Sequence, residues 1–125
     1  MAQGVRISLV FILKTMAAHL LSNNPSKLLE TFKEAIKKGH IDTWSVDSQG
    51  DFTHTPPQWK NLAWFRPVVR SDRLVLRIVK PQNGSVSWEV YGIYHGRIIE
   101  AFLVHCHALF SEGIATATPT TDDIL

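Results

Sequence analysis

Apolar residues recur every three or four positions over residues 25–38, the pattern of a helix with one buried side. The stripe consists of Leu28, Leu29, Phe32, Ala35 and Ile36. Asn24 is suited to cap the first turn and Pro25 to begin it, while Gly39 fits the left-handed position that ends many helices. We therefore expect an amphipathic helix that buries this stripe against the rest of the fold.

From residue 40 the hydrophobic period changes to two, which indicates strands. The predicted strands cover residues 40–46, 51–55, 62–70, 73–80 and 85–93. Gly50 permits a turn between the first two, and Ser71-Asp72 and Asn83-Gly84 mark the later turns. A second helix is expected from near His95 to Ser111.

This order of elements predicts an α+β protein, a two-layer sandwich in which an antiparallel meander of about five strands packs on an N-terminal and a C-terminal helix. We expect the folded domain over residues 25–113 and a flexible acidic tail over residues 114–125. The apolar segment at residues 1–24 is compatible with a strand and then a helix over residues 15–21, or with one buried helix.

The apolar run at residues 5–13 is too short to cross a bilayer, and Lys14 interrupts it. No clean signal-peptide cleavage site follows, so we expect a cytoplasmic protein with no membrane partner. Met16 is an alternative start of the chain. The single cysteine, Cys106, excludes an intramolecular disulfide and a zinc site built from several cysteines.

Turn length determines which side chains share a face of the sheet. A two-residue turn at Ser71-Asp72 places three apolar pairs on one face: Val69 with Leu74, Pro67 with Leu76, and Phe65 with Ile78. A three-residue loop ending at Gly84 would continue that face with Trp88 and Val90. The opposite face would then carry arginines, with Arg77 between Arg66 and Glu89.

Basic residues are concentrated in the same part of the chain, although the net charge is only +2. Residues 60–80 contain six basic side chains and one acidic one. If both helices cover the apolar face, the other presents arginines beside aromatic rings, which suits single-stranded nucleic acid or another polyanion. The predicted binding residues are Trp64, Arg66, Arg70, Arg73, Arg77 and Tyr91.

Two other interpretations of this face remain open. Alternating arginine and aliphatic residues are also typical of a sheet face that is simply solvated. The same face could bind a protein partner or a second copy of the chain, and the apolar residues available for this are Trp64, Val68, Val75, Tyr91 and Ile93.

Two histidines are candidates for catalysis. The first hairpin places Asp42 diagonal to His54, so that the carboxylate could orient an imidazole base. His95, in the expected strand-to-helix junction with Arg97, would lie near free amides that attract anions. These residues define a third hypothesis, a metal-independent ribonuclease in which arginine stabilises the phosphate. The expected order of elements resembles, in topology alone, small bacterial ribonucleases of the RelE type.

We expect neither a metal ion nor a cofactor. His105 and His107 point to opposite sides of the expected helix around Cys106, so they cannot chelate one ion. His40 shares a face with His54 but lies another pleat away. The sequence contains no glycine-rich phosphate loop, nucleophile elbow or zinc-protease motif.

Overall fold

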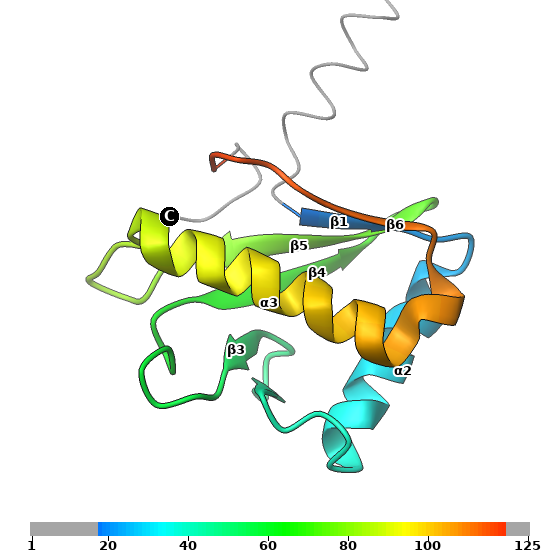
Figure 1. Ribbon diagram of the computed structural model, residues 1–125, viewed down its shortest axis with the longest axis horizontal. Helices are drawn as coiled ribbons and strands as arrows, with labels where there is room; N and C mark the ends of the chain where they lie inside the picture. The colour runs from blue at the N-terminus through cyan, green and yellow to red at the C-terminus, as the bar shows by residue number, and fades with distance from the viewer. Residues whose placement is uncertain (1–17, 120–125) are drawn as a thin grey trace, which may run out of the picture.

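The computed structural model describes residues 18–119 and shows a small α+β protein with one antiparallel sheet of six strands and two α-helices (Figure 1). In chain order the elements are β1 (Ala18–Leu21), α2 (Pro25–Lys37), β2 (Trp44–Val46), β3 (Phe52–His54), β4 (Trp64–Val69), β5 (Arg73–Val79), α3 (Trp88–Cys106), a short 3-10 helix (His107–Leu109) and β6 (Glu112–Ala115). Within the described residues, neither α-helix is long and apolar enough to cross a membrane.

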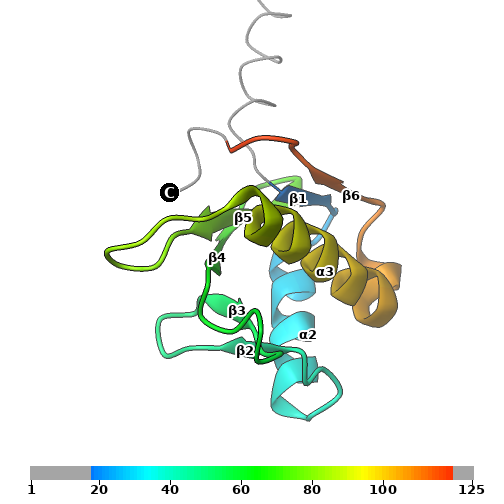
Figure 2. The same ribbon diagram turned by 60° about the vertical axis from the view of Figure 1, so that its left-hand side comes forward.

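The strands lie in the order β2-β3-β4-β5-β1-β6. The predicted meander is therefore correct for the four strands β2 to β5. The expected five-strand meander is wrong, because the sheet is completed by β1, which pairs with β5, and by β6, which pairs with β1. Strands from the two ends of the described chain thus form one edge of the sheet (Figure 2).

The first predicted helix is confirmed as α2. The side chain of Asn24 accepts a hydrogen bond from the backbone N–H of Lys27 at 3.3 Å, which is the expected N-cap. Gly39, just beyond the C-cap, has a φ of +81°, a conformation that costs glycine little because it has no Cβ.

In the first hairpin Trp44 lies opposite His54, and Val46 lies opposite Phe52. Gly50 takes a φ of +88° in its turn. The carboxylate of Asp47 accepts hydrogen bonds from the backbone N–H groups of Gln49 and Asp51 at 2.9 and 3.0 Å. This side-chain cap fixes the position of Asp51, which lies immediately before β3.

The predicted strand over residues 85–93 is wrong, and so is the start of the second helix near His95. Helix α3 begins at Trp88, and the side chain of Ser87 caps it by accepting a hydrogen bond from the N–H of Val90 at 3.2 Å. Residues three or four apart, including Tyr91, His95, Ile98 and Phe102, are buried along this helix. Because helical spacing buries all of them on one side, the helix is favoured over an alternating strand.

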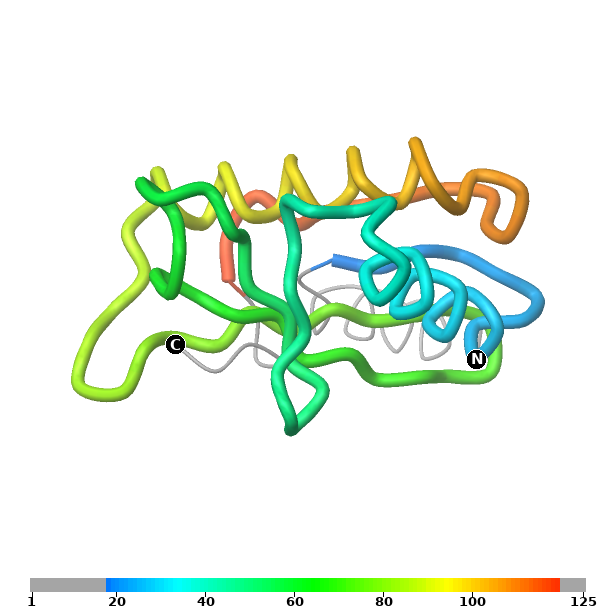
Figure 3. Tube along the Cα trace, turned by 90° about the horizontal axis from the view of Figure 1, so that it is seen from below, coloured from blue at the N-terminus to red at the C-terminus, as the bar shows by residue number. Residues whose placement is uncertain are grey.

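Both helices pack on the same face of β4 and β5, as seen from below in Figure 3. The rings of Phe32 in α2 and Phe102 in α3 stack with centroids 3.9 Å apart. Phe52 contacts Phe32 edge to face at 5.3 Å, and Phe65 lies on the same buried side. These aromatic contacts join the two helices to the sheet in one core.

Several predictions concern the ends of the chain. The apolar run at residues 5–13 lies outside the described residues. Ala18–Leu21 is a strand, so a helix over residues 15–21 is wrong where that range is described. Strand β6 (Glu112–Ala115) pairs with β1, so the first two residues of the expected flexible tail, 114 and 115, belong to the sheet. With β1 before α2 and β6 after α3, the described order of elements differs from the expected one that resembled the RelE-type ribonucleases.

Candidate functional site

The predicted register of the central hairpin is confirmed, and it separates apolar from basic side chains. Phe65 pairs with Ile78, Pro67 with Leu76 and Val69 with Leu74, and both helices lie on this side. The alternate residues of β4 and β5 lie on the other side, which we call the arginine face. It contains Trp64, Arg66, Val68, Arg73, Val75, Arg77 and Val79, with exposed Arg70 at its end.

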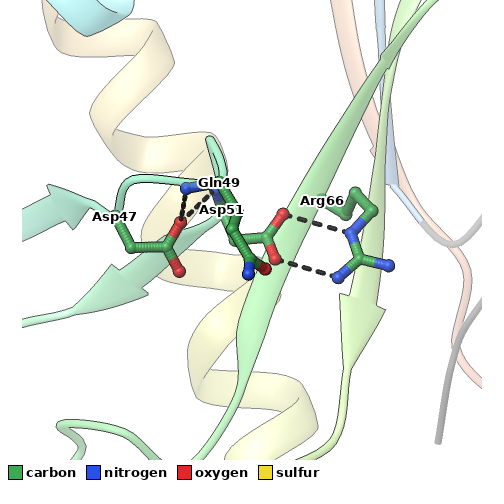
Figure 4. A network of polar contacts seen from close by, with 4 residues as sticks. All are labelled: Asp47, Gln49, Asp51 and Arg66. Atoms are coloured by element: carbon green, nitrogen blue, oxygen red, sulfur yellow. Dashed lines mark hydrogen bonds and ion pairs between the residues drawn. The ribbon is translucent and has the colours of Figure 1, made fainter.

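Arg66 lies directly opposite Arg77 in the register and is held by a carboxylate that the sequence analysis did not identify. Its Nε and Nη2 atoms donate to the two carboxylate oxygens of Asp51 at 3.2 and 3.0 Å (Figure 4). The Asp51 side chain is only 7% exposed, whereas that of Arg66 is 42% exposed. The hydrogen bonds that Arg66 donates to Asp51 raise the pKa of Arg66 above its usual value.

Arg73 lies beside Arg70, at the end of the arginine face where the turn joins β4 to β5. Its Nε and Nη2 atoms donate to the carboxylate of the neighbouring Asp72 at 3.0 and 2.9 Å. Its Nη1 lies 3.4 Å from Nδ1 of buried His19 in β1. Burial, and secondarily the charge of Arg73, lowers the pKa of His19, so that its neutral form is favoured beside the guanidinium.

Neither α2 nor α3 covers the arginines, but the face is not uniformly open to solvent. Val75 at its centre is fully buried, and His19 beside it is 3% exposed. The accessible cationic surface therefore lies around this buried centre, where Arg70 is exposed and Arg77 and Arg66 are half-buried.

Tyr91 and Glu89 do not lie on this face, because both belong to α3. Tyr91 is buried, and its hydroxyl donates to the carbonyl oxygen of Thr116 at 2.9 Å. Trp64 is thus the aromatic residue of the predicted set that remains on the face. Burial of Tyr91 and Val75 also removes part of the apolar area considered for a protein partner.

The structure does not bring the predicted catalytic residues together. His54 is buried in β3, and its Nδ1 lies 2.7 Å from the carbonyl oxygen of Thr43 rather than beside the Asp42 carboxylate. Asp42 is exposed and contributes only its backbone carbonyl, which accepts a hydrogen bond from the hydroxyl of Thr55. His54 and Asp42 are therefore not a dyad.

His95 is neither at a helix start nor on the surface. It lies in the second turn of α3, where its Nδ1 is 2.7 Å from the carbonyl oxygen of Tyr91. Burial lowers its pKa to about 4, although the hydrogen bond to Tyr91 opposes this. His95 is thus a neutral residue of the core.

His105 and His107 are exposed, whereas Cys106 between them is buried. Burial raises the pKa of the Cys106 thiol to about 11, which disfavours the reactive thiolate. In residues 18–119 no three histidine, cysteine or acidic side chains are grouped closely enough to hold a metal ion.

Comparisons with protein-family models, with curated proteins and with solved structures found no match. The role of Asp51 could not be predicted from the sequence, because acidic residues are common next to turns and carry no signal of a distant partner. Its contact with Arg66 follows only from the pairing of Phe52 with Phe65 across β3 and β4.

Proposed function

We propose that the arginine face binds a polyanion, and that single-stranded RNA is the class it suits best. The observation that carries the proposal is the direct opposition of Arg66 and Arg77 on the face that α2 and α3 leave uncovered. Guanidinium groups recognise phosphate oxygens through paired, charge-assisted hydrogen bonds.

The electrostatics of the hairpin support this proposal. Like charges directly opposite each other on adjacent strands destabilise a sheet. Asp51 compensates Arg66, and Asp72 compensates Arg73. Residues 64–79, which form β4, the turn and β5, contain four arginines and one acidic residue. The local charge therefore favours an anionic partner.

Trp64 would serve as the stacking platform for a base. It is half-buried and lies one pleat from Arg66 on the same face. Base stacking on an aromatic ring contributes about 1 to 3 kcal/mol and tolerates any base. A phosphate contact at Arg77 or Arg70 with a base on Trp64 would therefore favour a single strand over a duplex, whose bases are already stacked.

Fluorescence anisotropy with a labelled single-stranded RNA at several salt concentrations tests the proposal. The affinity of the wild-type protein should fall steeply with salt. The double variant Arg70→Gln and Arg77→Gln should bind more weakly, and the slope of log affinity against log salt should decrease by about 1.4, or about 0.7 for each phosphate contact of a single strand.

Arg66 is kept in this experiment because its loss would leave the buried carboxylate of Asp51 without a partner. The matched control replaces Lys33 and Lys37 of α2 with glutamine, which removes the same charge from another part of the surface. Equal losses in the two double variants, or no RNA binding by the wild-type protein at low salt, would overturn the proposal.

A further inference from the structure

A separate cavity of about 270 Å³ lies between the residues that follow β3 and the C-terminal half of α3. It does not include any residue of the arginine face. Its lining includes His54, Gln58, Trp59, Arg97, Glu100 and Val104. The cavity has the volume of about nine water molecules, which is enough for a small organic ligand.

The loop over residues 55–63 that forms one wall is fixed by hydrogen bonds to the core. The hydroxyl of Tyr94 in α3 donates to the carbonyl oxygen of Trp59. The hydroxyl of Thr53 donates to the carbonyl oxygen of Ala63 at 2.9 Å. Asn61, between these anchors, has a φ of +61° and donates its N–H to the Thr53 hydroxyl oxygen. The cavity is therefore built before any ligand arrives, which lowers the entropic cost of binding.

His54 supplies a buried acceptor to this cavity. The side chain is held between Trp44, whose ring is 4.6 Å away, and Tyr94, and the residue is 4% exposed. A carbonyl oxygen can only accept, so Nδ1 must donate its proton to Thr43. Nε2 of the neutral ring then carries a lone pair. Burial lowers the pKa of His54, which keeps this neutral form dominant at pH 7.

Nε2 of His54 has no hydrogen-bond partner within the described residues, yet it is not fully enclosed, unlike the unpaired Nε2 of His95. The contrast with His95 is informative, because the second ring nitrogen of His95 is sealed in the core. In His54, which lines the cavity, the corresponding atom is not sealed in this way.

Helix α3 contributes a compensated charge pair rather than a free charge. Nη1 of Arg97 lies 3.3 Å from Oε1 of Glu100, and both residues line the cavity. Because the two charges largely cancel, the pair favours neither an anion nor a cation. Together with Gln58, the pair offers donors and acceptors side by side, which is what a neutral ligand bearing several hydroxyl groups requires.

We propose that this cavity binds a neutral polyhydroxylated ligand about the size of a pyranose sugar. The amide and charged side chains would exchange hydrogen bonds with its hydroxyl groups, and Nε2 of His54 would accept one from a hydroxyl donor. Pro56, Trp59 and Val104 supply the apolar part of the lining against which the carbon atoms of the ligand pack. The inference is independent of RNA binding at the arginine face.

The test is an NMR titration of the full chain at pH 7, in which the ring signals of His54 and Trp59 are followed. The neutral probes are D-glucose, D-galactose, D-mannose and myo-inositol, and the charged probes are inorganic phosphate and acetate. Saturable shifts with at least one neutral probe, larger than those with either anion, support the proposal. Shifts with the anions alone, or with no probe, overturn it.

Glu100→Gln supplies the matching variant because the residue is exposed and its loss should not disturb the core. Removal of one charged hydrogen-bond partner should weaken binding of the best neutral probe about tenfold. The control is Glu30→Gln in α2, where Glu30 forms the same kind of pair with Lys33, three residues away. Equal affinities of the two variants would count against the proposed contact. Arg70→Gln should leave sugar binding unchanged, which separates this site from the arginine face.

Discussion

The neutral His95 in the core should make the protein lose stability in mild acid. Its ring packs against Tyr91 at 4.0 Å and Phe65 at 5.0 Å, and its Nε2 is enclosed without a hydrogen-bond partner within the described residues. Protonation would place a positive charge in this apolar environment, which is why burial lowers the pKa to about 4.

The sign and size of the effect follow from proton linkage. In the unfolded chain the pKa of a histidine is about 6.5, so the unfolded state binds the proton more readily than the native state. The contribution of His95 is complete above that value and is lost as the pH falls toward 4. With about 1.4 kcal/mol for each unit of difference, the total is roughly 3 kcal/mol, of which about 2 kcal/mol is lost between pH 7 and pH 5.

Urea denaturation at pH 7, 6 and 5, followed by tryptophan fluorescence, measures this loss. The pKa values of His54 and His19 are also lowered by burial, so the wild-type protein should lose more than the share due to His95. His95→Gln, of similar volume but without a titrating ring, should lose about 2 kcal/mol less than the wild type over this range.

A packing control distinguishes titration from general weakening. Phe65→Leu loosens the contact with His95 but keeps the histidine, so it should lower the free energy of unfolding at every pH and retain most of the pH dependence. If His95→Gln becomes less stable in acid by the same amount as the wild type, the buried histidine is not the source of the effect.

Three further predictions can be checked by the same urea denaturation at pH 7. Asn24→Ala removes the cap of α2 and should cost about 1 kcal/mol, whereas no change would show that the helix does not need the cap. Gly39→Ala should cost roughly 1 kcal/mol because the residue has a φ of +81°. Gly92→Ala should stabilise α3 by about 0.5 to 1 kcal/mol, because its Cβ would meet no atom within 4 Å. Changes of the same sign in both variants would contradict the different backbone conformations of the two glycines. Arg66→Ala should cost about 2 kcal/mol, because it leaves the buried carboxylate of Asp51 unpaired. Asp51→Ala should cost less, because it leaves only a half-exposed guanidinium unpaired, and equal losses in the two variants would contradict this.

Local signals in the sequence predicted the features that depend on neighbouring residues. Asn24 and Gly39 marked the ends of α2, and Gly50 marked the first turn. The two-residue turn at Ser71-Asp72 set the register of β4 and β5, and with it the separation of the arginines from the apolar face. Caps and tight turns are specified within a few residues, so they can be recognised without knowledge of the fold.

The segment over residues 85–93 shows where local preference was insufficient. Valine, tryptophan and tyrosine in partial alternation favour a strand. Ser87 was a signal for a helix start that this pattern obscured. The helix prevails because only helical spacing buries Tyr94, Ile98 and Phe102 together against α2 and the sheet.

By itself, therefore, the sequence determined an α+β protein with a capped helix, a correct hairpin register and a cluster of arginines on one side. Tertiary structure alone decided that β1 and β6 complete the sheet, that Asp51 neutralises Arg66, and that His54 lines a cavity with Arg97 and Glu100. These contacts join residues 15 to 97 positions apart in the chain. Their free energy comes from burial and pairing that exist only once the core has formed, so no short stretch of sequence encodes them.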